Sequence, residues 1–481
     1  MTRRLARGFA LGLLALAAST GTALGHSLNT TYESRLPLAV YLAGAAIAVA
    51  LSFAFVLLRD VRATLPAADV EARLPPAWLR LGLRAAGLVG WLWIVAQLVA
   101  GGGGDADVGT LFLWVYGWVG LALVSAFIGP AWNWLDPFTT LFDIGAWALR
   151  RAGIEPWEPS PYPRSLGHWP AVAGFAFFVW LELVMAQAPG RTLDTVLVGY
   201  TLFTLAMMVQ FGRDPWRANG EVFSVWFGLL GRLAPFALVD AAGRVRRRPF
   251  ASGLLEPGWT LADVVLIAFG TGSILFDGLS QITPWYEVFG APGALGETVQ
   301  LAGFLGLIAV AALGVSRLVG VAPTAAGLLP IAVGYLIAHY LTYLLIDGQR
   351  ILVAISDPLQ QGWDLFGTAF TVPSGDWLPP SSVWTIQLAA VVGGHMLGAW
   401  GGHVVARLHA PPALPASGAA AISPGAAADP RMRQVPLAVI MVALTTLTLW
   451  SLGQNIVRTP DQQTGSSTGI PVVATIGASS S

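Results

Sequence analysis

Stretches of roughly 20 apolar residues recur along the whole chain, separated by shorter polar segments. The hydrocarbon core of a bilayer is roughly 30 Å thick, so a helix needs roughly 20 apolar residues to cross it, and only a helix satisfies its own backbone hydrogen bonds there. The pattern therefore predicts an all-α, polytopic transmembrane bundle. About ten spans are expected, near residues 37–58, 80–100, 110–129, 170–188, 193–212, 259–280, 297–316, 325–347, 383–406 and 435–453.

Residues 1–25 have the pattern of a secretory signal peptide. Three arginines precede an apolar run, and the small residues Ala23 and Gly25 stand where a signal peptidase reads the chain. Cleavage after Gly25 would leave His26 as the first mature residue and 26–456 as the transmembrane domain. The alternative is an uncleaved first helix.

The arginines outside the leader predict the orientation. Nineteen of them fall into alternate loops, and only Arg35, Arg191, Arg350 and Arg458 fall into the others. Because cytoplasmic loops of membrane proteins are enriched in basic residues, the nineteen mark the inner face. The expected location is therefore a bacterial inner membrane, with both mature ends outside.

Four further segments have their own character. The segments 131–150 and 221–240 are apolar, rich in tryptophan and interrupted by charge, so they are expected to be interfacial amphipathic helices or re-entrant pieces on the cytoplasmic side. The segment 410–430 is a Pro/Ala-rich cytoplasmic linker, and 457–481 is expected to be a disordered outer tail.

Composition excludes several classes of protein. Only 11% of the 481 residues are charged, against roughly 25% in a soluble domain, so the lipid bilayer is the expected partner. The net charge is zero and no basic run is interleaved with aromatic residues, which argues against a nucleic-acid partner. The chain has no cysteine, so any metal must be held by histidine, carboxylate or the free amino terminus.

A few ionisable residues lie inside the expected spans, where they are costly and usually functional. Glu182 and Asp277 lie towards the outer ends of their spans, and His339 lies in the outer half of its span, with Asp347 further out. His395 lies near the middle of 383–406. Counted by the helical rise of about 1.5 Å per residue, His339 and His395 reach similar depths and are expected to face each other.

These residues predict a polar pocket that opens outward and that holds a metal or transfers protons. In this interpretation Asp277 and Glu182 are the catalytic groups, while His339 and His395 are metal ligands. The structural alternative is that both histidines only hydrogen-bond across the bundle. A third, less favoured reading makes them axial ligands of haem.

His26 would add a metal ligand of a different kind. A histidine at a mature amino terminus chelates through its free amine and its ring nitrogen, which suits copper. Histidine and carboxylate without thiolate therefore favour a divalent metal, copper or zinc. The alternative is an accidental histidine at the cleavage site.

Several blocks of sequence resemble one family. They are a histidine just after the leader, LPLAVYLAGAA, WNWLDPF at 132–138, PYPRSLGHWPAV, FVWLELV, FSVWFGLLGRLAP at 223–235, ILFDGLS at 274–280 and AHYLTYLLIDGQ at 338–349. The chain resembles the bacterial membrane proteins labelled fenitrothion hydrolase. The resemblance implies hydrolysis of organophosphorus-type esters by an inner-membrane enzyme, as one component of a complex with a second membrane subunit.

In such a hydrolase a metal-bound water would attack phosphorus while a carboxylate orients it. The competing prediction is a non-catalytic membrane subunit or a transporter-like protein that handles copper or haem for a partner complex. The resemblance carries no catalytic residue over to either.

Overall fold

The computed structural model describes residues 70–72, 75–100, 107–155, 158–185, 190–238, 245–290, 292–408 and 435–452. The leader, His26, the first expected span, the linker 410–430 and the tail 457–481 lie outside these residues.

Long apolar helices dominate the described residues. They are α3 (Ala77–Ala100), α9 (Gly190–Phe211), α12 (Leu261–Ser280), α14 (Gly293–Val319), α15 (Val321–Ile346) and α17 (Pro380–Leu408), together with a continuous helix made of α4 (Val108–Thr110), the π-helical η1 (Leu111–Leu121) and α5 (Ala122–Phe127). Within the described ranges, seven helices are long and apolar enough to cross a membrane. Two shorter helices, α8 (Trp169–Leu183) and α18 (Val435–Leu452), coincide with two further expected spans. The chain is therefore a helical membrane protein.

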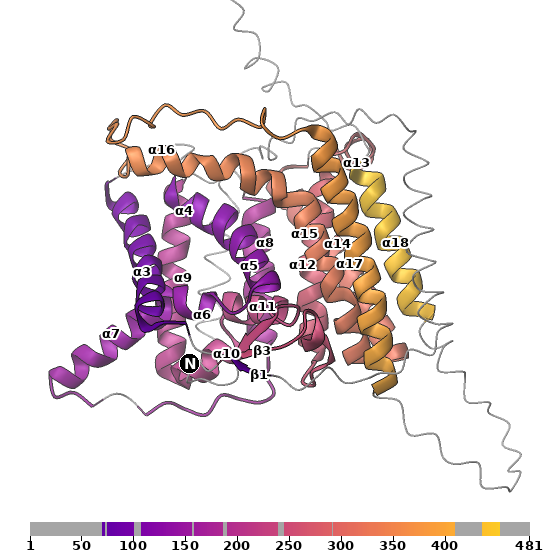
Figure 1. Cartoon of the computed structure of the whole chain (residues 1–481), viewed down its shortest axis with the longest axis horizontal. Helices are drawn as coiled ribbons and strands as arrows, with labels where there is room; N and C mark the ends of the chain where they lie inside the picture. The colour runs from indigo at the N-terminus through magenta and orange to yellow at the C-terminus, as the bar shows by residue number, and fades with distance from the viewer. Residues whose placement is uncertain are drawn as a thin grey trace, which may run out of the picture.

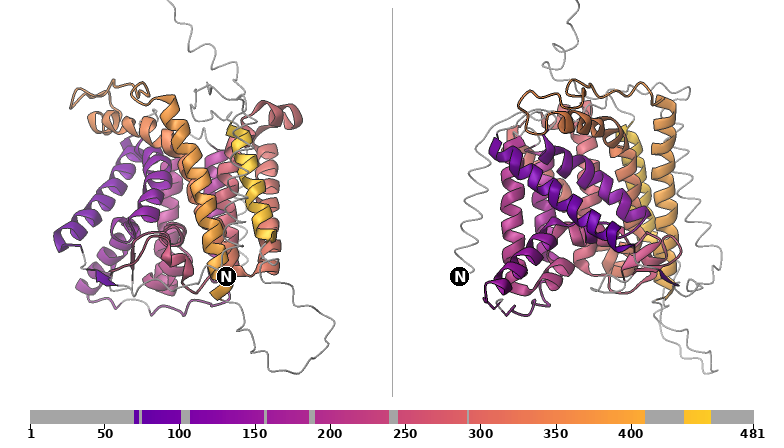
Figure 2. Two further views of the ribbon diagram at one scale, coloured as in Figure 1. Left: turned by 45° about the vertical axis from the view of Figure 1, so that its right-hand side comes forward. Right: turned by 60° about the vertical axis from the view of Figure 1, so that its left-hand side comes forward.

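Short elements gather at the two ends of this bundle (Figures 1 and 2). At one end, the sheet end, lie α6 (Trp132–Leu135), α7 (Pro137–Arg151), α10 (Arg213–Asn219), α11 (Val222–Leu230) and η2 (Ser252–Leu255), with strands β1 (Val70–Ala72), β2 (Phe236–Leu238) and β3 (Val245–Arg247). At the other end, the α16 end, lie α13 (Thr283–Phe289), η3 (Asp347–Arg350) and α16 (Ile351–Ser356). The chain after α16 returns across this end to α17.

The three strands form a small antiparallel sheet in the order β1-β3-β2, in which Arg247 pairs with both Val70 and Phe236. The all-α prediction missed this sheet. Each strand has three residues, which is too short to produce the alternating pattern by which strands are recognised.

The two segments expected to be interfacial differ from each other. Helix α7 is amphipathic and leaves Ile144 and Trp147 about half exposed, as predicted. For 221–240 the interfacial alternative is wrong, because α11 is buried inside the bundle and its Trp226 ring packs on Gly270 of α12, while the re-entrant alternative stays a prediction. Arg248, only 5% exposed, donates to the carbonyl oxygens of Gly231 and Ala234 at the end of α11, so this buried helix end is satisfied.

The start of α11 is satisfied in the same way. The Glu221 carboxylate accepts hydrogen bonds from the backbone N–H groups of Phe223 and Ser224 and from the Tyr200 hydroxyl. Burial, followed by the nearby Asp136 carboxylate, raises the pKa of Glu221. These bonds explain how a helix bearing a carboxylate is tolerated inside the protein.

Helices α15 and α17 pack at backbone distance along a row of glycines. A Cβ on Gly394 would lie 2.6 Å from the Pro330 carbonyl oxygen, and one on Gly398 would lie 2.3 Å from the Gly327 carbonyl oxygen. Small residues allow this approach between membrane helices. Gly394 and Gly398 on either side of His395 therefore serve the packing of α17 on α15.

We expect Gly394→Ala to lower the free energy of unfolding by about 1–3 kcal/mol, because the added methyl group forces the two backbones apart. Gly393→Ala is the matched control, since a Cβ there meets no atom within 4 Å and alanine favours helix. Reversible unfolding in mixed detergent micelles measures both variants. Equal stability of the two would contradict the packing assigned to Gly394.

Candidate functional site

A contact at the sheet end aligns the first turn of α8 with the first turn of α12 along the bundle. His168 Nδ1 lies 2.5 Å from Asp263 Oδ1, where His168 is the N-cap of α8 and Asp263 closes the capping box of α12 with Thr260. Glu182 follows His168 by 14 positions, and Asp277 follows Asp263 by 14. At about 1.5 Å per residue both carboxyl groups therefore reach the same height, about 21 Å along their helices.

Helix α15 completes the site between them. The Tyr340 hydroxyl lies 3.0 Å from Glu182 Oε1 and 3.3 Å from Asp277 Oδ2, and His339 Nε2 lies 2.8 Å from the same Asp277 oxygen. Gln281 donates to the other oxygen of Asp277 at 2.7 Å. We call Glu182, Tyr340, Asp277 and His339 the relay cluster, because hydrogen bonds connect them in this order.

The relay cluster is buried but not fully satisfied. Glu182 is 3% exposed and Asp277 is 5% exposed. Glu182 Oε2 has no hydrogen-bond partner. A buried carboxyl oxygen without a partner is costly, which is why such atoms are usually associated with function.

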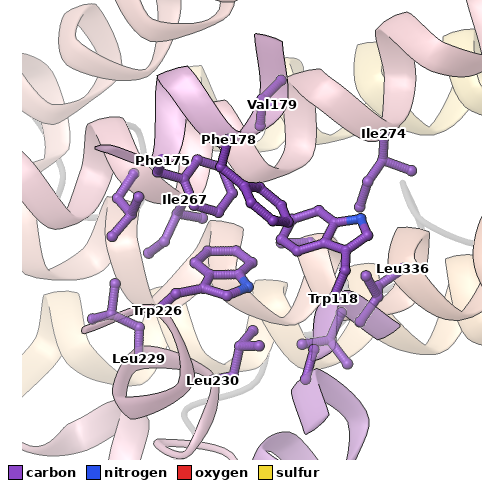
Figure 3. Packing of buried hydrophobic residues seen from close by; sticks show 14 of the residues in the cluster. Trp118, Phe175, Phe178, Val179, Trp226, Leu229, Leu230, Ile267, Ile274 and Leu336 are labelled. Carbon is purple, nitrogen blue, oxygen red and sulfur yellow. The ribbon is translucent and has the colours of Figure 1, made fainter. Parts of the chain in front are cut away.

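Towards the sheet end an apolar plug closes the space below the relay cluster (Figure 3). Phe178 and Leu336 lie one helical turn before Glu182 and Tyr340, and both belong to the buried core. Trp118 packs against Phe178 at a centroid distance of 5.2 Å and stacks on Trp226 at 6.0 Å. The side chains of this plug are hydrophobic, and its polar atoms include the buried indole nitrogens of Trp118 and Trp226.

Towards the α16 end the surroundings are more polar and more open. The side chain of His339 is 11% exposed, Asp347 is 18% exposed and Arg350 is 29% exposed. Asp347 and Arg350 form an ion pair at 3.2 Å, and Tyr343 interacts electrostatically with that pair and with the relay cluster. Solvent access therefore rises towards the α16 end.

The chain around α16 is fastened across this end. Tyr116 donates to the Gly348 carbonyl, Gln349 exchanges two hydrogen bonds with Ser374, and Gln97 donates to the Pro358 carbonyl. The chain from η3 through α16 to α17 thus lies across the α16 end of the bundle (Figure 1).

The structure brings together three of the expected site residues and leaves His395 apart. His395 is fully buried on α17, where its Nδ1 lies 2.7 Å from the Val391 carbonyl and its ring packs against Tyr335 at 5.7 Å. The expected face-to-face arrangement of His339 and His395 is not found. His339 is hydrogen-bonded to Asp277 of α12, whereas the His395 ring packs against Tyr335 of α15. Within the described part of the chain, no group of three His, Asp or Glu side chains is arranged to hold a metal ion.

Sequence reasoning missed Tyr340 and Gln281. The sequence singled out ionisable residues within apolar spans, whereas the bridging hydroxyl comes from Tyr340, the residue next to His339. A tyrosine in an apolar helix differs from phenylalanine by one oxygen, and its usual place is the membrane interface. Its position near the end of α15 therefore gave no signal.

Comparisons with models of protein families, with curated proteins and with solved structures find no match to this chain.

The arrangement is suited to proton transfer, since each step along the relay cluster is a hydrogen bond between groups that can both give and accept a proton. Two carboxyl groups and an imidazole are also the groups that most often act as general acids and bases. The site therefore has the means to move a proton between Glu182 and His339.

We expect Tyr340→Phe to lower the free energy of unfolding by about 1–3 kcal/mol, because it leaves both oxygens of Glu182 without a donor. In a Glu182→Met background the same change should cost less than about 1 kcal/mol, since no buried acceptor is then left unsatisfied.

Tyr335→Phe is the matched control for this cycle. Tyr335 is buried on the same helix, and its hydroxyl faces Thr448 without the geometry of a hydrogen bond. Unfolding in mixed micelles gives all the values. Additive effects of Tyr340→Phe and Glu182→Met would show that the hydroxyl and the carboxyl group do not interact.

Proposed function

We propose that this chain is an integral protein of a bacterial inner membrane whose relay cluster takes up and releases protons on the outer side. In the proposed topology the leader is cleaved, the mature chain crosses ten times and both mature ends lie outside. The distribution of arginines supports this orientation, because the α16 end then faces outward.

One observation carries the proposal: the Tyr340 hydroxyl lies within hydrogen-bond distance of both Glu182 and Asp277. A hydroxyl has a single proton, so it donates to one carboxyl group and can accept from the other. Two carboxylates this close in a buried site repel each other, and sharing a proton relieves that repulsion.

The proton then moves in a balanced sequence. Protonated Glu182 gives its proton to the Tyr340 oxygen while Tyr340 passes its own proton to Asp277. Asp277 passes a proton to His339 Nε2, which lies on the more exposed side of the cluster. Glu182 is left ionised and His339 is left charged, so one proton has moved towards the α16 end.

Such a cluster can serve an enzyme or a transporter. In an enzyme, His339 would act as general acid or base towards a substrate that arrives from the α16 end. In a transporter-like protein, the same proton would change the charge of the site as a solute binds. Proton exchange is common to both, which is why it is the function proposed here.

Metal-dependent hydrolysis of organophosphorus-type esters stays a prediction that rests on the family resemblance. Asp277 and His339 could provide two ligands if their hydrogen bond opened, and His26 lies outside the described residues. Handling of copper or haem for a partner subunit likewise stays a prediction.

Infrared difference spectroscopy of the protein in membranes, stepped in pH, tests the proposal. We expect a band from a protonated carboxyl group that shifts in D₂O and that is lost or moved in Glu182→Gln and in Asp277→Asn. Glu287→Gln, an exposed glutamate on α13, is the control and should leave the band unchanged. A spectrum indifferent to both cluster variants would refute proton exchange at this site.

Metal chelation separates the two kinds of chemistry. Proton exchange alone predicts the same carboxyl band before and after treatment with a strong chelator. A band that changes on chelation and returns with zinc or copper would instead favour a metal centre.

A further inference from the structure

An apolar groove lies between α3 and α7 at the sheet end. It shares no helix with the relay cluster, which lies on α8, α12 and α15. Its walls are Leu81, Ala85 and Leu88 of α3 and Ile144 and Trp147 of α7, and its volume is about 360 Å³. We call it the α3–α7 groove. Helix α7 extends away from the bundle (Figure 1), so the groove lies at the periphery, where lipid surrounds a membrane protein.

Polar side chains close the inner part of the groove. Arg84 forms an ion pair with Asp143 and donates to Thr140. Asp143 also accepts from Arg213 at 2.8 Å. The acidic charge inside the groove is therefore already neutralised by two arginines.

The open end of the groove carries further positive charge. Gly87 packs directly on the carbonyl of Leu135, the last residue of α6. Arg84, earlier in α3, contacts Thr140 and Asp143, which come later in the chain on α7. The contacts therefore run in opposite directions along α3 and along α6 and α7. This antiparallel order places Arg80, one turn before Arg84, near the end of α7 that bears Arg151.

Among the described residues, neither Arg80 nor Arg151 has an acidic partner in an ion pair. Arg80 Nε is buried without a hydrogen-bond partner, and the Arg151 guanidinium lies 5.7 Å from the centre of the Trp147 ring. Arg80 directly precedes Leu81 and Arg151 lies over Trp147, and both Leu81 and Trp147 line the groove, so each cation lies next to a wall residue and Arg80 has a donor left unused.

We propose that the α3–α7 groove binds an anionic phospholipid, with an acyl chain along its apolar walls and the phosphate between Arg80 and Arg151. The guanidinium group suits this role because its planar set of donors matches phosphate oxygens. Arginines next to the membrane attract anionic lipids, while the groove itself is filled by hydrocarbon. This site is independent of the proposed proton exchange.

Native mass spectrometry of the detergent-purified full chain tests the proposal, with phosphatidylglycerol and phosphatidylcholine of identical acyl chains as probes. We expect phosphatidylglycerol to bind more tightly. Arg80→Gln and Arg151→Gln should each weaken it about fivefold and weaken phosphatidylcholine less, because the choline ammonium of phosphatidylcholine already offsets the charge of its phosphate. Arg247→Gln, an exposed arginine on β3 at the same end of the molecule, is the matched control for loss of charge and should have no effect.

A second variant tests the groove itself. Ala85→Trp fills the space between the walls and should weaken binding of both lipids while both headgroup arginines remain. Equal affinities for the two lipids, or equal losses in Arg80→Gln and Arg247→Gln, would overturn the proposal. Full displacement of the lipid by inorganic phosphate would also overturn it, because the groove would then contribute nothing.

Discussion

The contact between His168 and Asp263 is the constraint on which the site depends. It joins the first turns of α8 and α12, and from there two uninterrupted helices carry Glu182 and Asp277 over the same number of residues. A shift of one residue in either helix would rotate its carboxyl group by about 100° and raise or lower it by about 1.5 Å. The Tyr340 hydroxyl could not then reach both groups, so the contact between His168 and the buried Asp263 at one end determines a buried hydrogen-bond network near the other.

The environment of the relay cluster gives those hydrogen bonds their importance. Trp118, Phe178 and Leu336 exclude water on the side of the sheet, whereas Asp347 and Arg350 lead towards solvent on the other. In such low-dielectric surroundings an unpaired charge costs far more than in water, and a hydrogen bond to it gains in proportion. The orphaned oxygen of Glu182 is therefore the least satisfied atom of the network.

The sequence was sufficient to locate the long helices. It was insufficient to predict how each helix is rotated about its own axis. Apolar length located the helices, and charge within apolar runs singled out Glu182, Asp277 and His339. Helical rise gave a depth for His395 but not the side of the helix that faces α15. The glycines next to His395 pack on α15, and its ring lies against Tyr335. The burial of α11 also escaped prediction, because it depends on Arg248, a residue 18 positions beyond Leu230 that satisfies the helix end.

Helix α15 belongs to two assemblies with different mechanical properties. On one side its glycines and Pro330 meet α17 at backbone distance, so sliding would drive carbonyl groups into the opposite backbone. On the other side it meets α8 and α12 through the hydrogen bonds of the relay cluster, each of which lengthens without a steric clash. Protonation changes the strength of those hydrogen bonds and leaves the glycine contacts unaltered. A change of charge at the cluster would therefore act on the contacts of α15 with α8 and α12 and not on its backbone contacts with α17.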